Sequence, residues 1–166
     1  MISELLLSEF DEEVKKTRAM LERIPVKPDF KPHAKSMPLG KLAPHVAELA
    51  GFGHTILTTP KLDFGSGGPR TRPRFESPEQ LVQAFEQGVE RVRTALKSTP
   101  DPAWSQPWKL SFNGKPIFSG SHFLAYRQMF VNHLVHHRAQ LGVYLRLNDK
   151  PLPATYGPSA DDTMGF

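Results

Sequence analysis

The chain has 166 residues and a mass of 18.6 kDa, which fits one compact domain over residues 1–166 and leaves little room for two. Hydrophobic residues make up 39% and charged residues 23%, a globular composition that excludes a disordered or fibrous chain. The net charge of +4 is well short of the positive field of a nucleic-acid-binding protein. Cysteine is absent, which excludes disulfides, thiolate metal ligands and a cysteine nucleophile.

The chain also lacks the apolar segments that membrane proteins need. No apolar run approaches the roughly 20 residues of a membrane span, and the first residues do not form the basic and apolar regions of an export signal. We therefore expect a cytoplasmic protein with neither a membrane nor a nucleic acid as its partner.

The first two helices are predicted from apolar residues that recur three and four positions apart. One helix is expected from Ser3 to Ile24, with the charged side chains between Glu4 and Arg23 on a solvated outer face. A second is expected to begin near Pro38 and to continue to Ile56. Pro44 lies inside this second pattern, so we expect it to kink the helix or to delay its regular start.

A long connection leads to the third helix. Residues 58–76 show no periodicity and contain Arg70, Arg72 and Arg74, a pattern that fits either a functional lid or a tolerated surface insertion. Three positive charges on such a loop are a weak indication of phosphate binding. The run Ser77-Pro78-Glu79-Gln80 then predicts a helix start, because it supplies an N-cap serine and a first-turn proline.

The last part of the chain changes from a strand pattern to a helix pattern. Residues 107–118 alternate around Asn113-Gly114, the strongest two-residue turn signal, so we predict a small β-hairpin there. The longest helix is expected from about Ser121 to Asn148, followed by an irregular tail. The order of elements predicts an all-α protein: a four-helix bundle with long connections and a small hairpin before the last helix.

Histidines on two of these helices are candidates for a metal site. His133 and His137 are four residues apart on the last helix, so their rings project from one face. His45 falls on the apolar stripe of the second helix, so three imidazoles could meet in the core. The spacing alone leaves two interpretations open, a metal site and hydrogen-bonded core histidines. The remaining histidines are expected to be ordinary structural or surface residues: His33, His54, His122 and His136.

Several familiar catalytic motifs are missing. The segment from His133 to His137 has no glutamate after its first histidine, which excludes the zinc-protease helix. The sequence also contains no phosphate-binding P-loop, no dinucleotide-binding glycine pattern and no Gly-x-Ser-x-Gly nucleophile turn. A general base cannot be assigned from the residues.

Three segments resemble the DinB/YfiT-like metalloenzymes of the DinB superfamily. They are Leu42 to Leu49 (LAPHVAEL), Asn132 to Leu141 (NHLVHHRAQL) and Tyr156 to Asp161 (YGPSAD), and the order of elements agrees over nearly the whole chain. Two features depart from the family pattern, namely Ala139 where glycine is common, and Pro44 just before His45.

The resemblance implies a four-helix bundle, often a homodimer, that holds one divalent ion (zinc, nickel or iron) through His45, His133 and His137. Some relatives use such a site to activate a low-molecular-weight thiol and transfer it to an electrophile, or to open a small ring. It therefore implies a metal-dependent transferase, moving a thiol to a small electrophile, or a hydrolase. The alternative is a non-catalytic stress-related or binding protein with a structural metal.

The number of ligands bears on this choice. Three protein ligands leave at least one coordination position open, as in catalytic zinc sites. The free ring N–H of each imidazole then needs a partner that orients it. Helical phase alone offers four candidates for that role: Glu48, Tyr126, Gln140 and Tyr144.

Overall fold

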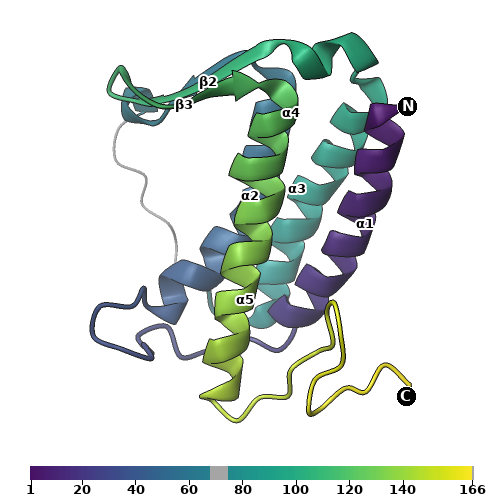
Figure 1. Cartoon of the computed structure of the whole chain (residues 1–166). Helices are drawn as coiled ribbons and strands as arrows, with labels where there is room; N and C mark the ends of the chain where they lie inside the picture. Colours follow the sequence, from purple (N-terminus) through teal and green to yellow (C-terminus); the bar gives the residue numbers. More distant parts are fainter. Residues whose placement is uncertain (68–74, 166) are drawn as a thin grey trace.

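The computed structural model describes residues 1–67 and 75–165 and shows a mostly helical protein with a small three-stranded sheet (Figure 1). The long helices are α1 (Ile2–Leu21), α2 (Leu39–Thr58) and α3 (Pro78–Ser98), and the last helical run joins α4 (His122–Leu124), the π-helical segment η3 (Ala125–Val131) and α5 (Asn132–Arg146). The strands are β1 (Lys61–Asp63), β2 (Pro107–Phe112) and β3 (Lys115–Ser121), accompanied by the 3₁₀ helices η1 (Phe64–Gly67) and η2 (Asp101–Ser105). None of the helices described is long and apolar enough to cross a membrane.

The core lies between the helices. α3 packs against both α1 and α2, and α5 packs against the same two helices from the other side (Figure 1). The apolar stripes predicted for these helices are buried here: Leu6, Phe10, Val14, Leu21, Leu39, Leu42, Leu49, Ile56, Leu81, Phe85, Val89, Val92 and Leu96. The periodicity of the sequence therefore identified the packing faces correctly.

The bounds of the first two helices differ from those predicted. α1 ends at Leu21, three residues before Ile24, although Ile24 is only 1% exposed and still belongs to the core. α2 begins at Leu39, next to the start predicted near Pro38, and ends at Thr58, two residues after Ile56; Pro44 lies inside it and does not delay its start. Pro44 is buried, and its packing offsets the backbone hydrogen bond that a proline cannot donate.

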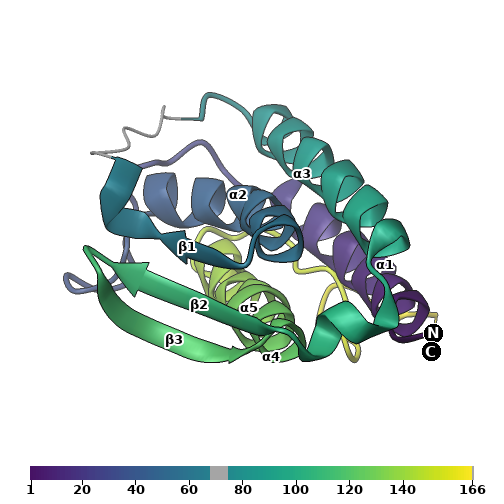
Figure 2. The same ribbon diagram turned by 90° about the horizontal axis from the view of Figure 1, so that it is seen from above.

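The sheet has one strand more than the predicted hairpin. Figure 2 shows β1 beside α2, β2 next to it and β3 outermost. β1 pairs in parallel with β2, and β2 pairs antiparallel with β3 across a turn in which Asn113 and Gly114 both have positive φ, 50° and 76°. The hairpin prediction is confirmed, but the prediction of residues 58–76 as structureless is wrong for β1 and η1. Arg70, Arg72 and Arg74 lie outside the described residues.

A single carboxylate joins β1 to the hairpin. Asp63 accepts hydrogen bonds from Ser111 Oγ at 2.8 Å and from the backbone N–H groups of Asn113 and Gly114 at 2.9 and 2.8 Å. It also accepts one from the N–H of Gly65 at 2.8 Å. These donors, with those of Gly65 and Gly114 the strongest, hold the pKa of Asp63 below its usual value. The ionised carboxylate thus stabilises the hairpin turn and holds β1 against the hairpin.

The last helical run is not a uniform α-helix. It was predicted as one helix from Ser121 to Asn148, and it extends from His122 to Arg146, but its second section is the π-helical segment η3. Phe130 of this segment packs directly on α2, where a Cβ added to Gly53 would lie 2.5 Å from the phenyl ring. Such segments arise as local insertions in α-helices and occur often at functional sites.

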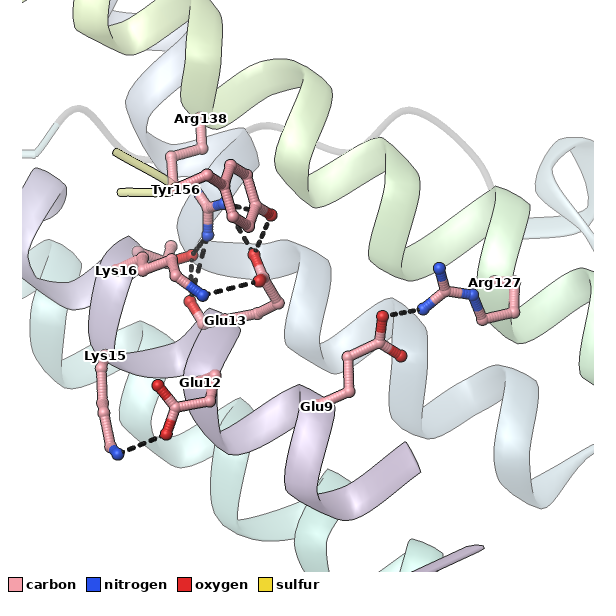
Figure 3. A network of polar contacts seen from close by, with 9 residues as sticks. Glu9, Glu12, Glu13, Lys15, Lys16, Arg127, Arg138 and Tyr156 are labelled. Carbon is pink, nitrogen blue, oxygen red and sulfur yellow. Dashed lines mark hydrogen bonds and ion pairs between the residues drawn. The ribbon is translucent and has the colours of Figure 1, made fainter. Parts of the chain in front are cut away.

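A buried polar cluster ties the C-terminal tail to α1 and α5 (Figure 3). Arg138 Nη2 lies 2.6 Å from Glu13 Oε2, and their side chains are only 2% and 6% exposed. Tyr156 of the tail donates its hydroxyl to Glu13 at 2.7 Å and accepts from Arg138 at 2.8 Å, while Lys16 Nζ lies 3.1 Å from Glu13 Oε1. The prediction that all charges of the first helix lie on a solvated face is therefore wrong for Glu13, because residues distant in sequence supply its partners.

Candidate metal centre

Three histidine side chains from two helices meet beside the core. His45 projects from α2, and His133 and His137 project from α5, one turn apart. The Nε2 atom of His133 lies 3.3 Å from Nε2 of His45 and 2.8 Å from Nε2 of His137. One nitrogen from each of the three rings falls within 4.8 Å of the other two, and all three residues are half-buried. The structure thus brings together the three histidines that were singled out in the sequence.

The opposite ring nitrogens show which protons the imidazoles carry. His133 Nδ1 lies 3.2 Å from the carbonyl oxygen of Met129, which can only accept, so Nδ1 is the protonated nitrogen. His137 Nδ1 lies 2.7 Å from Gln140 Oε1. The amide nitrogen of Gln140 faces His136 Nε2 at 3.3 Å, which agrees with this orientation of the amide. With these partners on Nδ1, the Nε2 atoms of His133 and His137 are the nitrogens turned toward the shared point.

With both rings protonated on Nδ1, two lone pairs face each other across 2.8 Å and repel unless a cation lies between them. A proton could fill that role, but the pKa of His133 is lowered, first by burial and then by the neighbouring His137 and His136. Protonation is thus disfavoured where the nitrogens converge. A divalent cation removes the repulsion and keeps every imidazole neutral.

The separations of the nitrogens also fit a metal ion. Nitrogens bound at about 2.0–2.1 Å in a tetrahedral site lie about 3.3 Å apart. The distance between His45 and His133 is 3.3 Å, and that between His133 and His137 is 2.8 Å. The third pair, the nitrogens of His45 and His137, lies within 4.8 Å, so modest shifts of the rings would place all three around one ion. The donor set, three imidazoles with the opposite nitrogens of two of them anchored, is therefore suited to one divalent ion.

The other histidines take the structural roles expected of them. His136 is exposed and faces Gln140 instead of the shared centre. His122 Nε2 contacts the carbonyl oxygens of Ile56 and Thr59 at 2.9 and 3.2 Å, which ties the start of α4 to the end of α2. His33 Nδ1 accepts from the backbone N–H of Lys35.

Of the four side chains expected to orient the imidazoles, Gln140 does so for His137, because its Oε1 lies 2.7 Å from Nδ1 of that ring. Tyr144 donates instead to the carbonyl oxygen of Met37, and the buried Tyr126 packs against Trp104 and Phe130. Glu48 lies beside His45 in the wall of an adjoining pocket. The sequence analysis did not identify the carbonyl of Met129 as a partner of His133. The available signal was that Met129 lies four residues before His133, one helical turn away.

Two pockets adjoin the three histidines. A pocket of about 580 Å³ between α2, α3, η3 and the sheet reaches His45 and His133. A second, of about 400 Å³, reaches His137 and Gln140 from the side of Lys35 and Tyr144. The centre therefore lies between two openings that small molecules can enter.

The fold and this site define a mostly helical protein with a three-histidine candidate metal centre. The chain belongs to the DinB family, because the model of that family matches residues 1–164. This finding confirms the resemblance seen in the sequence. No curated protein matches the chain.

Two solved structures have a similar fold. A DinB-like protein from Bacillus cereus is 19% identical with a TM-score of 0.67, and the match covers 90% of this chain and 95% of that one. A DinB-like protein from Bacillus subtilis is 17% identical with a TM-score of 0.64, and the match covers 87% of this chain and 92% of that one. At these identities the likeness shows the fold alone.

Proposed function

We propose that the protein binds one divalent metal ion through His45, His133 and His137 and uses it as a transferase that moves a low-molecular-weight thiol to a small electrophile, or as a hydrolase. The observation that carries the proposal is the convergence of ring nitrogens of His45, His133 and His137 within 4.8 Å of one another, while the opposite nitrogens of His133 and His137 are engaged. Imidazole nitrogens are suitable ligands for zinc, nickel and iron.

The residues around the centre have separate tasks in this proposal. The carbonyl of Met129 and the amide of Gln140 hold the rings of His133 and His137 in the orientation that directs Nε2 to the shared point. The apolar pocket beside His45 excludes water from a bound substrate. When bound, a divalent ion acts as a Lewis acid and lowers the pKa of a thiol or a water molecule.

A non-catalytic stress-related or binding protein with a structural metal is the alternative function. A structural site is closed by a fourth protein ligand, whereas three ligands leave a position for a substrate. Among the described residues, the group of histidines and acidic residues able to share an ion has three members, and two pockets lead to it. These observations favour the catalytic proposal.

Metal binding is tested with protein purified without added metal. We expect titration calorimetry with zinc or nickel to give one ion per chain, and His133→Ala to weaken binding by more than about 100-fold, because loss of a ligand exceeds the effect of an outer partner. His54→Ala is the matched control, since His54 lies on α2 nine residues after His45 and lines neither of the two pockets. Unchanged stoichiometry and affinity in both His133→Ala and His137→Ala would refute the ligand assignment.

Catalysis is tested by offering the metal-loaded protein a panel of low-molecular-weight thiols and small electrophiles. We expect thiol consumption that is abolished by His133→Ala and unaffected by His54→Ala. If full metal occupancy supports no turnover with any thiol or hydrolysable substrate and raises only the melting temperature, the structural alternative is correct.

We extend the proposal to the organisation of the protein. One family model spans residues 1–164, which supports a single domain over residues 1–166 with the helices arranged as a four-helix bundle. An apolar groove of about 750 Å³ lies between α1 and α4, and Ile2, Leu5 and Phe123 are exposed along it. Such a groove supports a homodimer. We also place the protein in the cytoplasm. Light scattering with the wild type and Leu5→Glu tests the dimer, which the charge is expected to dissociate.

A further inference from the structure

We propose that the pocket of about 580 Å³ beside His45 and His133 selects an elongated apolar molecule that carries one carboxylate, and that Arg91 is the residue that recognises this carboxylate. The inference rests on the proposed function, in that it names the class of electrophile presented to the metal centre. Arg91 acts in substrate specificity and takes no part in holding the ion.

The walls of this pocket are mainly apolar and come both from the helices and from the sheet. α2 contributes Phe52, β1 and η1 contribute Leu62 and Phe64, and the hairpin contributes Leu110 and Ile117. The rings of Phe52 and Phe64 contact each other with centroids 5.7 Å apart, and Phe64 and Ile117 remain 43% and 57% exposed. Exposed apolar side chains around a cavity favour an apolar ligand that covers them.

Arg91 brings a positive charge to this apolar wall. Its Nε donates to the carbonyl oxygen of Gln87 at 3.3 Å, which holds the side chain along α3. Its Nη2 lies close over Gly51 of α2, since a Cβ at that glycine would be 3.4 Å from Nη2. Within residues 1–67 and 75–165 the exposed Arg91 forms no ion pair, whereas Arg93 of the same helix pairs with Asp11. The fork of Nη donors is therefore available to a ligand.

The positions of Arg91 and the histidines set the length of that ligand. Gly51, beneath the guanidinium, follows His45 by six residues on α2, which corresponds to about 9 Å along the helix. A molecule held at Arg91 by its carboxylate thus presents its opposite end to the three histidines.

A carboxylate fits this site better than other polar groups. A guanidinium and a carboxylate form paired hydrogen bonds in one plane, and these are stronger than bonds between neutral groups. Arg91 is exposed in the free protein, and a ligand that lies over the pocket shields the paired charges from solvent. A neutral molecule of the same shape gains only the apolar contacts.

The test compares decanoate with decanol, which share an alkyl chain and differ in charge. Binding is measured by titration calorimetry on the full chain without metal, so that a carboxylate cannot bind through the ion. We expect decanoate to bind more tightly than decanol. Arg91→Gln should weaken decanoate about tenfold, or about 1.4 kcal/mol, and leave decanol unchanged.

Two further variants make the result specific. Lys97→Gln removes the same charge from an exposed position on the same helix, outside the pocket, and is expected to leave the affinity for decanoate unchanged. Ala84→Phe fills part of the pocket and should weaken both ligands. Equal effects of Arg91→Gln and Lys97→Gln, equal affinities for decanoate and decanol, or no binding of either would overturn the inference.

Failure of this inference is distinguishable from failure of the proposed function. Decanoate binding that depends on Arg91 and persists in His133→Ala, with no metal bound by the wild type, would refute the metal centre alone. Metal binding that requires the three histidines, without any effect of Arg91→Gln on decanoate, would refute the carboxylate site alone.

Discussion

The buried cluster of Glu13, Arg138 and Tyr156 and the group of three histidines lie on neighbouring faces of α5, yet they are electrostatically opposite. In the cluster, each donor meets an acceptor, and the charges of Arg138 and Glu13 lie 2.6 Å apart. Among the histidines, three ring nitrogens of the same kind converge, with those of His133 and His137 only 2.8 Å apart. The first arrangement pairs opposite charges within the chain, whereas the second gathers ligand atoms that one cation can share.

This difference separates a structural role from a binding role. Polar groups buried for stability are satisfied by the chain itself, because unsatisfied ones destabilise the fold. Polar groups arranged to bind a ligand have a hydrogen-bonding or charge partner missing, and the ligand supplies that partner. The comparison predicts that changes in the cluster affect unfolding, whereas changes at the histidines affect affinity for metal.

The largest effect on stability is expected from breaking the buried ion pair. Arg138→Met leaves the carboxylate of Glu13 in the core with only Lys16 and Tyr156 as partners. We expect the free energy of unfolding of the metal-free protein to fall by about 3 kcal/mol, as measured by urea denaturation.

The double variant Glu13→Gln/Arg138→Met is the control for this prediction. Removing both charges eliminates the uncompensated carboxylate, so the double variant should be more stable than Arg138→Met alone. Equal stability of the wild type and Arg138→Met would show that the pair contributes nothing to the fold.

A smaller effect is expected at the edge of the metal centre. Gln140→Leu removes the acceptor of His137 Nδ1 and frees the ring to turn. We expect the affinity for zinc to fall about 10- to 100-fold, with stability of the metal-free protein nearly unchanged. Gln140→Glu keeps an acceptor oxygen at the same position and should retain the affinity of the wild type. Full affinity in Gln140→Leu would show that this hydrogen bond does not orient the ring.

The smallest effect concerns the dependence of stability on pH. Burial alone would raise the pKa of Glu13, but the hydrogen bond from Tyr156 and the charges of Arg138 and Lys16 outweigh it and hold the pKa below 4.5. The unfolded chain therefore binds more protons in acid, so this contribution is present above pH 4.5 and is lost as the pH falls through the folded pKa.

The measurement is the free energy of unfolding between about pH 5 and pH 3, in the wild type and in Glu13→Gln/Arg138→Met. We expect the wild type to lose stability more steeply than the double variant over this interval. Identical slopes would mean that Glu13 titrates alike in the folded and unfolded chains.

Local patterns predicted much of this molecule. The spacing of Leu6, Phe10 and Val14 identified the buried face of α1, and Asn113-Gly114 identified the hairpin turn. The four-residue spacing of His133 and His137 placed both rings on one side of α5. Each of these features depends on residues close in sequence, where helical or strand geometry fixes the arrangement.

Features that depend on distant residues were missed. β1 has only three residues, too few to show an alternating pattern, and it exists because it pairs with β2. Glu13 looks like one of many surface charges of α1 until Arg138 and Tyr156 fold over it. The π-helical segment leaves the same residue types in place and changes only their hydrogen bonding, so apolar spacing could not reveal it.

The sheet has a consequence for how this architecture diversifies. The three histidines belong to helices, whereas Leu62, Leu110 and Ile117 line the adjoining pocket from strands that Asp63 fastens together. Replacing one of these strand residues reshapes the cavity without moving an imidazole. Substitutions in these strands can thus change which substrate the pocket accepts while the three histidines stay in place. One fold can in this way acquire new substrate specificities through a few substitutions in its sheet.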